Sequence, residues 1–103
     1  MFHLKSQLLY NNSMRKITLK KRFGALGKDL DVKVMVNGQI ISELKVGEEE
    51  KSIEVYNGSQ VVVCQVEDED KNIYRSNSFF LTGSKSAVAF LDINGMRINI
   101  KER

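Results

Sequence analysis

The chain has 103 residues, a length typical of a single domain. Apolar residues make up 42% and charged residues 28% of it, which are values of a folded globular protein and exclude a disordered tail. Its one cysteine, Cys64, excludes an intramolecular disulfide and any metal site built on several cysteines. Because no run of about 18 apolar residues occurs, we expect no membrane span and no membrane partner, and a cytoplasmic protein is the default expectation.

The net charge of +3 conceals a polarised layout along the chain. Residues 1–36 carry eight Lys/Arg against two Asp, whereas residues 37–72 carry three Lys against nine Asp/Glu. This layout has two interpretations. It could provide two patches for two partners, or it could let neighbouring strands attract each other at their solvent faces. We favour the second interpretation.

The N-terminal segment differs in pattern from the rest of the chain. Residues 1–13 lack a clear periodicity, contain no continuous apolar core of a signal peptide, and end in Asn11-Asn12-Ser13. From Met14 onward, apolar and polar residues alternate with the period of two that marks a half-buried strand. We therefore predict a flexible leader over residues 1–13 and one domain over residues 14–103.

The first half of this domain predicts strands separated by tight turns. Residues 15–23 and 31–36 alternate, and Asn37-Gly38 then provides the type I′ turn of a two-residue hairpin. Residues 39–46 come next, and their alternation predicts one inward side made of Ile40, Ser42, Leu44 and Val46.

The second half repeats the same pattern. Further strands are predicted at 51–56, 60–67, 73–82, 87–93 and 96–101, with Asn57-Gly58 and Asn94-Gly95 as two more hairpin turns. Residues 60–67 are apolar on both faces, which indicates a central strand covered on both sides. With no amphipathic helix of twelve residues, the sequence predicts an all-β fold. Specifically, we expect a single small antiparallel β-sandwich of about 7–8 short strands linked by Asn-Gly hairpin turns.

Few residues offer catalytic or metal-binding chemistry. His3, the one histidine, lies in the leader, and Cys64 has apolar neighbours that favour an unreactive core thiol. The run Asp68-Glu69-Asp70-Lys71-Asn72 starts like a calcium loop but lacks the glycine and glutamate that such a loop needs further on, so a solvated loop is favoured over a weak cation site. We therefore expect no enzyme activity and no cofactor.

Two groups of residues are candidates for binding a partner. The basic residues of the first strand could steer an encounter, and the aromatic residues Tyr74, Phe79 and Phe80 imperfectly alternate, so that at least one is expected to point outward as an anchor while two join the core. The candidate partner-binding residues are Arg15, Lys16, Lys20, Lys21, Arg22, Phe79 and Phe80, with Lys28 as a further basic residue.

The stretch VKVMVNGQIISELKVGEEEKSIEVYNGSQVVVCQV, within residues 15–66, resembles small bacterial Ig-like sandwich modules of the PEGA type and carboxypeptidase-regulatory-like domains. The resemblance consists of a strand, an Asn-Gly turn, a strand ending in LKVGE and then alternating valines. The Pro-Glu-Gly-Ala motif of PEGA domains is missing, and the chain has no proline. The resemblance implies a non-catalytic accessory sandwich and supplies no site residues.

These observations favour a non-enzymatic module that binds another protein, as a monomer or weak homodimer, through an exposed strand edge or an aromatic anchor. One alternative is a nucleic-acid or polyanion binder that uses the same basic strand, whose affinity would fall steeply with salt. Another is a small inhibitor of a host complex, encoded by a phage or a mobile element.

Overall fold

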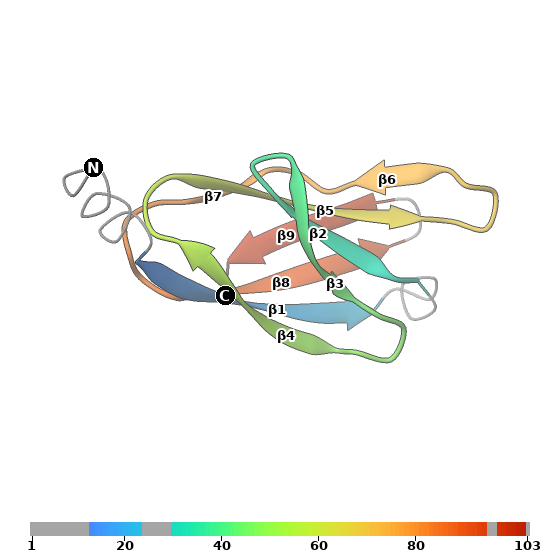
Figure 1. Ribbon diagram of the computed structural model, residues 1–103. Coiled ribbons are helices and arrows are strands. Elements are labelled where there is room, and N and C mark those ends of the chain that lie inside the picture. The colour runs from blue at the N-terminus through green and yellow to red at the C-terminus, as the bar shows by residue number, and fades with distance from the viewer. Residues whose placement is uncertain (1–12, 24–29, 95–96, 103) are drawn as a thin grey trace.

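The computed structural model describes residues 13–23, 30–94 and 97–102 of the backbone, and side chains within 13–22 and 30–92. Nine strands occur in these ranges, which form two packed sheets (Figure 1). They are β1 (Met14–Phe23), β2 (Val32–Val36), β3 (Gln39–Leu44), β4 (Glu50–Tyr56), β5 (Gln60–Glu67), β6 (Ile73–Arg75), β7 (Phe79–Leu81), β8 (Ala87–Asn94) and β9 (Arg97–Glu102). The predicted all-β sandwich is confirmed.

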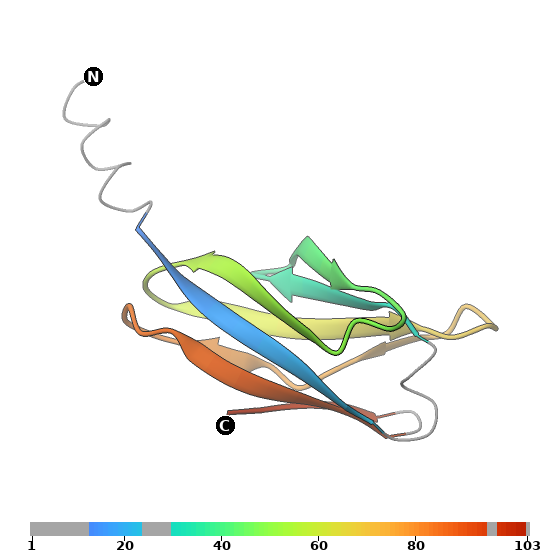
Figure 2. The ribbon, with the colours of Figure 1, turned by 90° about the horizontal axis from the view of Figure 1, so that it is seen from below.

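The two sheets divide the chain between them. Sheet A has the order β4-β1-β8-β9, and sheet B has the order β3-β2-β5-β6, with β7 also paired to β5 (Figure 2). Every pairing is antiparallel except one: β1 runs parallel to β8, with Ile17 opposite Ala87. The prediction of a purely antiparallel sandwich is wrong at this pair, because the two strands lie far apart in sequence and are not joined by a hairpin.

The Asn-Gly turns occur in two kinds of connection, hairpins within one sheet and a crossing between the sheets. Asn37-Gly38, with φ values of 50° and 84°, closes the predicted hairpin between β2 and β3. Asn57-Gly58 instead carries the chain from β4 in sheet A to β5 in sheet B, so the prediction of a hairpin there is wrong. Strands β8 and β9 do form the third predicted hairpin, but residues 95 and 96 at its tip lie outside the described residues.

The predicted strand 73–82 is interrupted. β6 pairs with one end of β5 and β7 with the other, and between them Ser76 Oγ accepts a hydrogen bond from Cys64 N while Ser76 N donates one to Cys64 O. Ser76 thus provides hydrogen-bond partners for the backbone N–H and C=O groups of Cys64 in the middle of β5, between the parts of that strand that pair with β6 and with β7. Tyr74 in β6 and Phe79 in β7 both pack against the core although they lie five positions apart, so the alternation changes phase at this interruption and Phe80 is left outward.

The core consists of the inward-facing alternate residues of both sheets. Ile17, Leu19 and Leu91 from sheet A meet Val62 and Cys64 from sheet B, and all of these are fully buried. β5 lies inside its sheet, as predicted, but only one of its faces is fully buried, because its outward residues are half-exposed.

Strand β3 departs from the predicted alternation. Its pairing with β2 shifts register between Val34 and Met35, which leaves Ile41 as an extra residue on the β3 side. Leu44 is buried as expected, but Ile40 is 54% exposed and Val46, beyond the strand, is 55% exposed, so their predicted inward position is wrong. The bulge at Ile41 turns Ile40 to the outer face. Val46 lies past the end of β3, where the alternation of a strand no longer applies.

The placement of Cys64 gives a direct test of the core. Burial raises the pKa of its thiol to about 12 from the ordinary 9.0. Because folding raises this pKa, the contribution of the thiol to stability is complete below pH 9.0 and is lost as the pH rises through about 12. We expect an aromatic disulfide reagent near pH 8 to leave the native thiol unmodified and to modify one equivalent at once in concentrated guanidinium. Rapid modification of the native protein would contradict this placement.

Candidate functional site

Arg15, predicted to belong to an exposed basic surface, is buried and only 4% exposed. Its Nη1 donates to the carbonyl oxygens of Thr82 (3.1 Å) and Gly83 (3.0 Å), and its Nη2 donates to that of Gly58 (2.7 Å). These carbonyls belong to the two segments that cross between the sheets at this end, from β4 to β5 and from β7 to β8. Burial lowers the pKa of the guanidinium, but a guanidinium remains charged at neutral pH. Arg15 therefore holds these crossings together and is removed from the candidate binding surface.

At the other end of β1, Lys21 likewise donates a hydrogen bond to a segment that crosses between the sheets. It is 6% exposed, and its Nζ donates to the carbonyl oxygen of Lys45 at 3.0 Å, in the segment that crosses from β3 to β4. Desolvation lowers the pKa of this ammonium, and the carboxylates of Asp31 and Glu48 partly oppose that shift. The prediction that Lys21 contributes to an exposed basic surface is therefore also wrong. Alternation places positions 15 and 21 on the same face of β1 as the buried residues 17 and 19.

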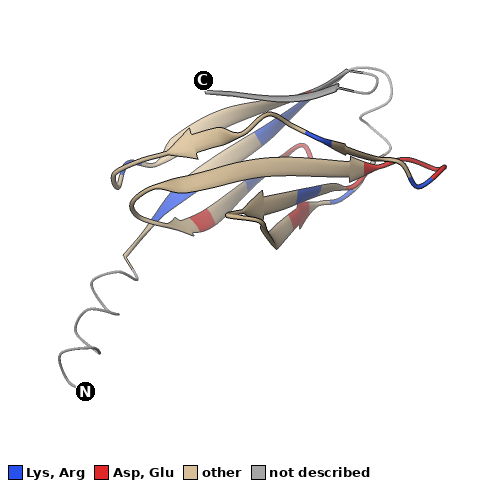
Figure 3. Ribbon diagram, turned by 90° about the horizontal axis from the view of Figure 1, so that it is seen from above, with Lys and Arg blue, Asp and Glu red and all other residues tan. Residues whose placement is uncertain are grey.

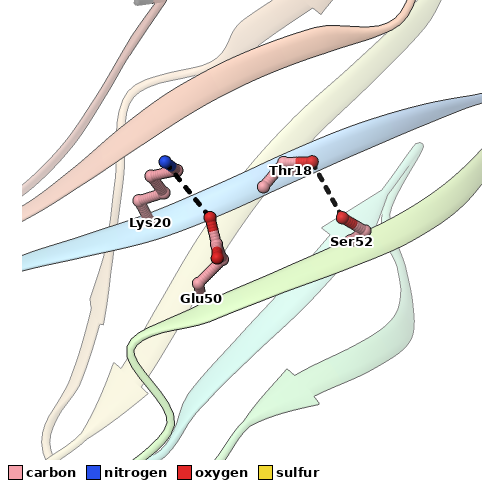
Figure 4. A network of polar contacts seen from close by, with 4 residues as sticks. All are labelled: Thr18, Lys20, Glu50 and Ser52. Atoms are coloured by element: carbon pink, nitrogen blue, oxygen red, sulfur yellow. Dashed lines mark hydrogen bonds and ion pairs between the residues drawn. The ribbon is translucent and has the colours of Figure 1, made fainter.

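The outward residues of β1 do reach the surface, but β4 places acidic residues opposite the two lysines and a serine opposite Thr18. Lys20 Nζ lies 3.2 Å from Glu50 Oε1, and Thr18 and Ser52 share a hydrogen bond of 2.8 Å between their hydroxyl oxygens (Figure 4). Lys16 lies opposite Glu54 in the same register. The interpretation that neighbouring strands attract each other at their solvent faces is thus confirmed for this pair of strands.

The last basic residue of β1 meets an aromatic ring. Arg22 is exposed, and its guanidinium carbon lies 3.8 Å from the centre of the Phe90 ring on β8, a cation–π contact. Lys28 lies outside the described residues. Among the described side chains, the outward lysines of β1 thus lie opposite acidic residues of β4, and Met14, Tyr56, Val88 and Phe90 are apolar residues on the same outer face of sheet A.

The outer face of sheet B is different in character. In register, Met35 lies opposite both Ile40 and Val63, and Val61 lies opposite Phe80. Directly opposed residues share one face of a sheet, and none of these five packs against the core. We call them the apolar stripe: Ile40, Met35, Val63, Val61 and Phe80, which cross four strands.

Exposure along the apolar stripe is highest at its two ends. Phe80 is 71% exposed and Ile40 is 54% exposed, while the three residues between them are half-buried. Figure 3 shows that β5 and β7 carry no charged residue apart from Glu67 at the end of β5. Phe79 and Tyr74 pack against the core, so the expectation that one of the three aromatic residues points outward and two join the core is confirmed.

A second open feature lies where the two sheets separate. A groove of about 640 Å³ lies between β3 and β4, the edge strands of the two sheets on this side. We call it the edge groove. The described residues that line it are of three kinds: apolar Met14, Val36, Ile41, Ile53, Val55 and Tyr56, polar Asn37, Gln39, Ser42, Ser52 and Gln60, and charged Glu54.

The acidic loop after β5 is occupied by its own hydrogen bonds. Asp68 Oδ1 accepts from the backbone N–H groups of Asp70 (2.9 Å) and Asn72 (2.8 Å), and Oδ2 accepts from the Tyr74 hydroxyl (3.1 Å). Hydrogen bonding to Asn72 is the main cause that lowers the pKa of this carboxyl. The carboxylate closes a turn and is already saturated with donors, which favours the solvated loop over the cation site.

The described residues contain no group of three or more His, Cys, Asp or Glu side chains that could hold a metal ion. Cys64 is buried in the core, and His3 lies outside the described residues. Among the described residues, no helix is long and apolar enough to cross a membrane.

No protein-family model matches the chain, and no curated protein sequence matches it. Among solved structures, the fold is similar to that of a protein from Bacteroides ovatus described as a "putative cell adhesion protein". The TM-score is 0.58 at 16% sequence identity, and the match covers 88% of this chain and 44% of that one. The chain thus spans less than half the length of that protein, and at this identity the similarity concerns the fold.

Local sequence patterns indicated Phe80 but not the rest of the apolar stripe. Met35, Val61 and Val63 appear in the sequence as members of two valine-rich strands, and nothing local shows that one face of those strands lacks a covering layer. An exposed strand edge is expected from the sequence, but the position of the edge groove is not, because it depends on which two strands are left at the edges of the sheets.

The role of Arg15 can be tested against its neighbour on the opposite face of the same strand. Arg15→Met leaves three carbonyl oxygens of the crossing segments without their donor, and we expect it to lower the free energy of unfolding by about 1–3 kcal/mol. Lys16→Met, on the exposed face, should change it by less than about 1 kcal/mol. Equal effects of the two variants in urea-induced unfolding would show that Arg15 does not hold the crossings.

Proposed function

We propose that this chain is a non-enzymatic binding module for another protein and that the apolar stripe on sheet B is its contact surface, with Phe80 as the main anchor. The observation that carries the proposal is the apolar row on the outer face of sheet B. It is continuous across four strands and ends at the exposed Phe80, whereas the outward lysines of β1 on sheet A lie opposite acidic residues of β4.

An exposed phenylalanine at the end of such a row is well suited to serve as an anchor. Its ring contributes apolar area at a small cost in conformational entropy, and burying it against a partner is worth about 1.5–3 kcal/mol. Binding energy in protein interfaces concentrates in a few such side chains, surrounded by contacts that exclude water. The half-buried Val61 and Val63 on the neighbouring strand would provide that surround.

The structural similarity is compatible with this proposal. The Bacteroides ovatus protein is described as an adhesion protein, and adhesion is a function of binding surfaces rather than of catalytic groups. Because only the fold is shared, that description supports a binding module in general and identifies no partner.

The basic residues of β1 contribute less to the proposed contact surface than the sequence predicted. Of its five basic residues, two hold crossing segments inside the fold, and Lys20 is paired with Glu50. A charge reversal that included Lys21 would place a carboxylate beside the Lys45 carbonyl and close to Asp31 and Glu48, so it would destabilise the fold and could not serve as a test of binding. No observation on the described residues favours the nucleic-acid alternative over protein binding.

The proposal predicts that Phe80→Ser abolishes partner capture and leaves the fold intact. Because the ring is 71% exposed, the unfolding midpoint should hardly change. Tagged wild-type protein and the variant are used as baits in extracts of the native host, and co-purifying proteins are quantified by mass spectrometry. The loss of an anchor worth about 1.5–3 kcal/mol should reduce capture of the true partner tenfold or more.

Val46→Ser is the matched control for this experiment. Val46 is also an exposed apolar side chain, at 55%, but it lies in the segment between β3 and β4 and outside the apolar stripe. The proposal requires at least one protein that wild type and Val46→Ser capture equally and Phe80→Ser does not. It is overturned if every captured protein is retained equally by all three baits.

A further inference from the structure

The free edge of β4 has a defined pattern of backbone groups. Lys21 N donates to Glu49 O and Asn57 N donates to Ser13 O, so the odd-numbered residues of this strand form the hydrogen-bonded pairs with β1. Ser52, Glu54 and Tyr56 lie in the alternate, non-hydrogen-bonded pairs. Their N–H and C=O groups therefore point away from β1, and within the described ranges no backbone or side-chain group is bonded to them.

These backbone groups lie along the edge groove. Ile53 and Val55, whose side chains point between the sheets, form the β4 side of it, and Val36 and Ile41 face them from sheet B. Ile41, which the bulge sets out of the regular alternation, is 43% exposed, and so is Met14 at the end of the groove. The groove thus combines a row of unpaired backbone groups with apolar side chains from both sheets.

We propose that the edge groove binds an extended segment of a partner polypeptide, which adds to β4 as a further strand of sheet A. A strand is the one common element whose donors and acceptors repeat at the two-residue spacing of the free groups on β4. Its alternate side chains would point into the groove between the sheets and bury themselves against Ile41 and Ile53.

The lining also defines the chemistry of this segment. Apolar side chains are required at every second position, about 6–7 Å apart, to fill the space between the sheets. Glu54 lines the groove and points to the outer face, so a basic residue at a neighbouring outward position of the segment would meet it across the new pair. β4 has seven residues, which sets the length of segment that it can pair with.

This proposal shares with the proposed function only the class of partner, a protein. It concerns a different surface, and the two can fail separately. Phe80→Ser should leave binding at the edge groove unchanged, and changes on β4 should leave capture through the apolar stripe unchanged.

The test uses a displayed library of random seven-residue segments selected for binding to the full chain. Glu54→Pro is the decisive variant, since proline removes the outward N–H group and leaves the bonds of β4 to β1 in place. Glu54→Gln keeps that N–H group and removes only the charge. We expect the enriched segments to alternate apolar residues, to bind Glu54→Pro at least tenfold more weakly, and to bind Glu54→Gln more weakly only where they carry a basic residue.

Hydrogen exchange measured by NMR gives a readout that does not depend on how Glu54→Pro folds. A synthetic peptide from the enriched set should slow exchange of the Ser52, Glu54 and Tyr56 amides at least tenfold and leave those of Ile53 and Val55, already bonded to β1, unchanged. The same peptide with N-methyl groups on its β4-facing amides should not bind. The proposal is overturned if no alternating segment is enriched, if the methylated peptide binds equally, or if the three amides already exchange slowly in the free protein.

Discussion

The arrangement of this sandwich depends on two cations that β1 directs inward. Arg15 and Lys21 lie at opposite ends of the strand, on the same face as its buried isoleucine and leucine, and each donates hydrogen bonds to backbone carbonyls of segments that cross between the sheets. Burying a charged group is costly unless it is hydrogen-bonded, so each cation requires these segments to stay in place. One strand thereby ties together three of the crossings between the sheets.

The same constraint decides which basic residues of β1 reach the surface. With two of its basic residues inside, β1 presents outward Lys16 and Lys20, and the acidic β4 lies directly opposite them. The outward lysines of β1 thus have opposite charges facing them within their own sheet. Sheet B also has an opposed charged pair, Lys33 and Glu43, but beside it runs the apolar stripe with Phe80 at its end. The polarised charge of the sequence therefore supports the pairing of β1 with β4, and the contact surface that we propose lies on the other sheet.

Much of this fold follows from local patterns in the sequence, and the candidate sites follow from it only in part. Alternation predicted the strands, Asn37-Gly38 predicted its hairpin, and the neighbours of Cys64 predicted a core thiol. Asn57-Gly58 has the same turn chemistry but crosses between sheets, because a turn reverses the chain without deciding which strand it will pair with. Arg15 and Lys21 show a different limit. Their positions in the alternation already placed them on the inward face, but their charge suggested the surface, since an arginine or lysine is seldom buried without a partner. Their partners are backbone carbonyls of distant segments, and because every residue has a carbonyl, the sequence does not identify which ones accept these hydrogen bonds.

The inward placement of the two cations is tested most directly by the register of β1 against β4, because a slip by one residue would turn Arg15 and Lys21 outward and Lys16 and Lys20 inward. In the non-hydrogen-bonded pairs of an antiparallel ladder, the two Hα atoms approach closely. The observed register predicts strong cross-strand Hα–Hα nuclear Overhauser effects between Lys16 and Glu54 and between Thr18 and Ser52. Effects that instead join Lys16 to Val55 or to Ile53 would contradict it.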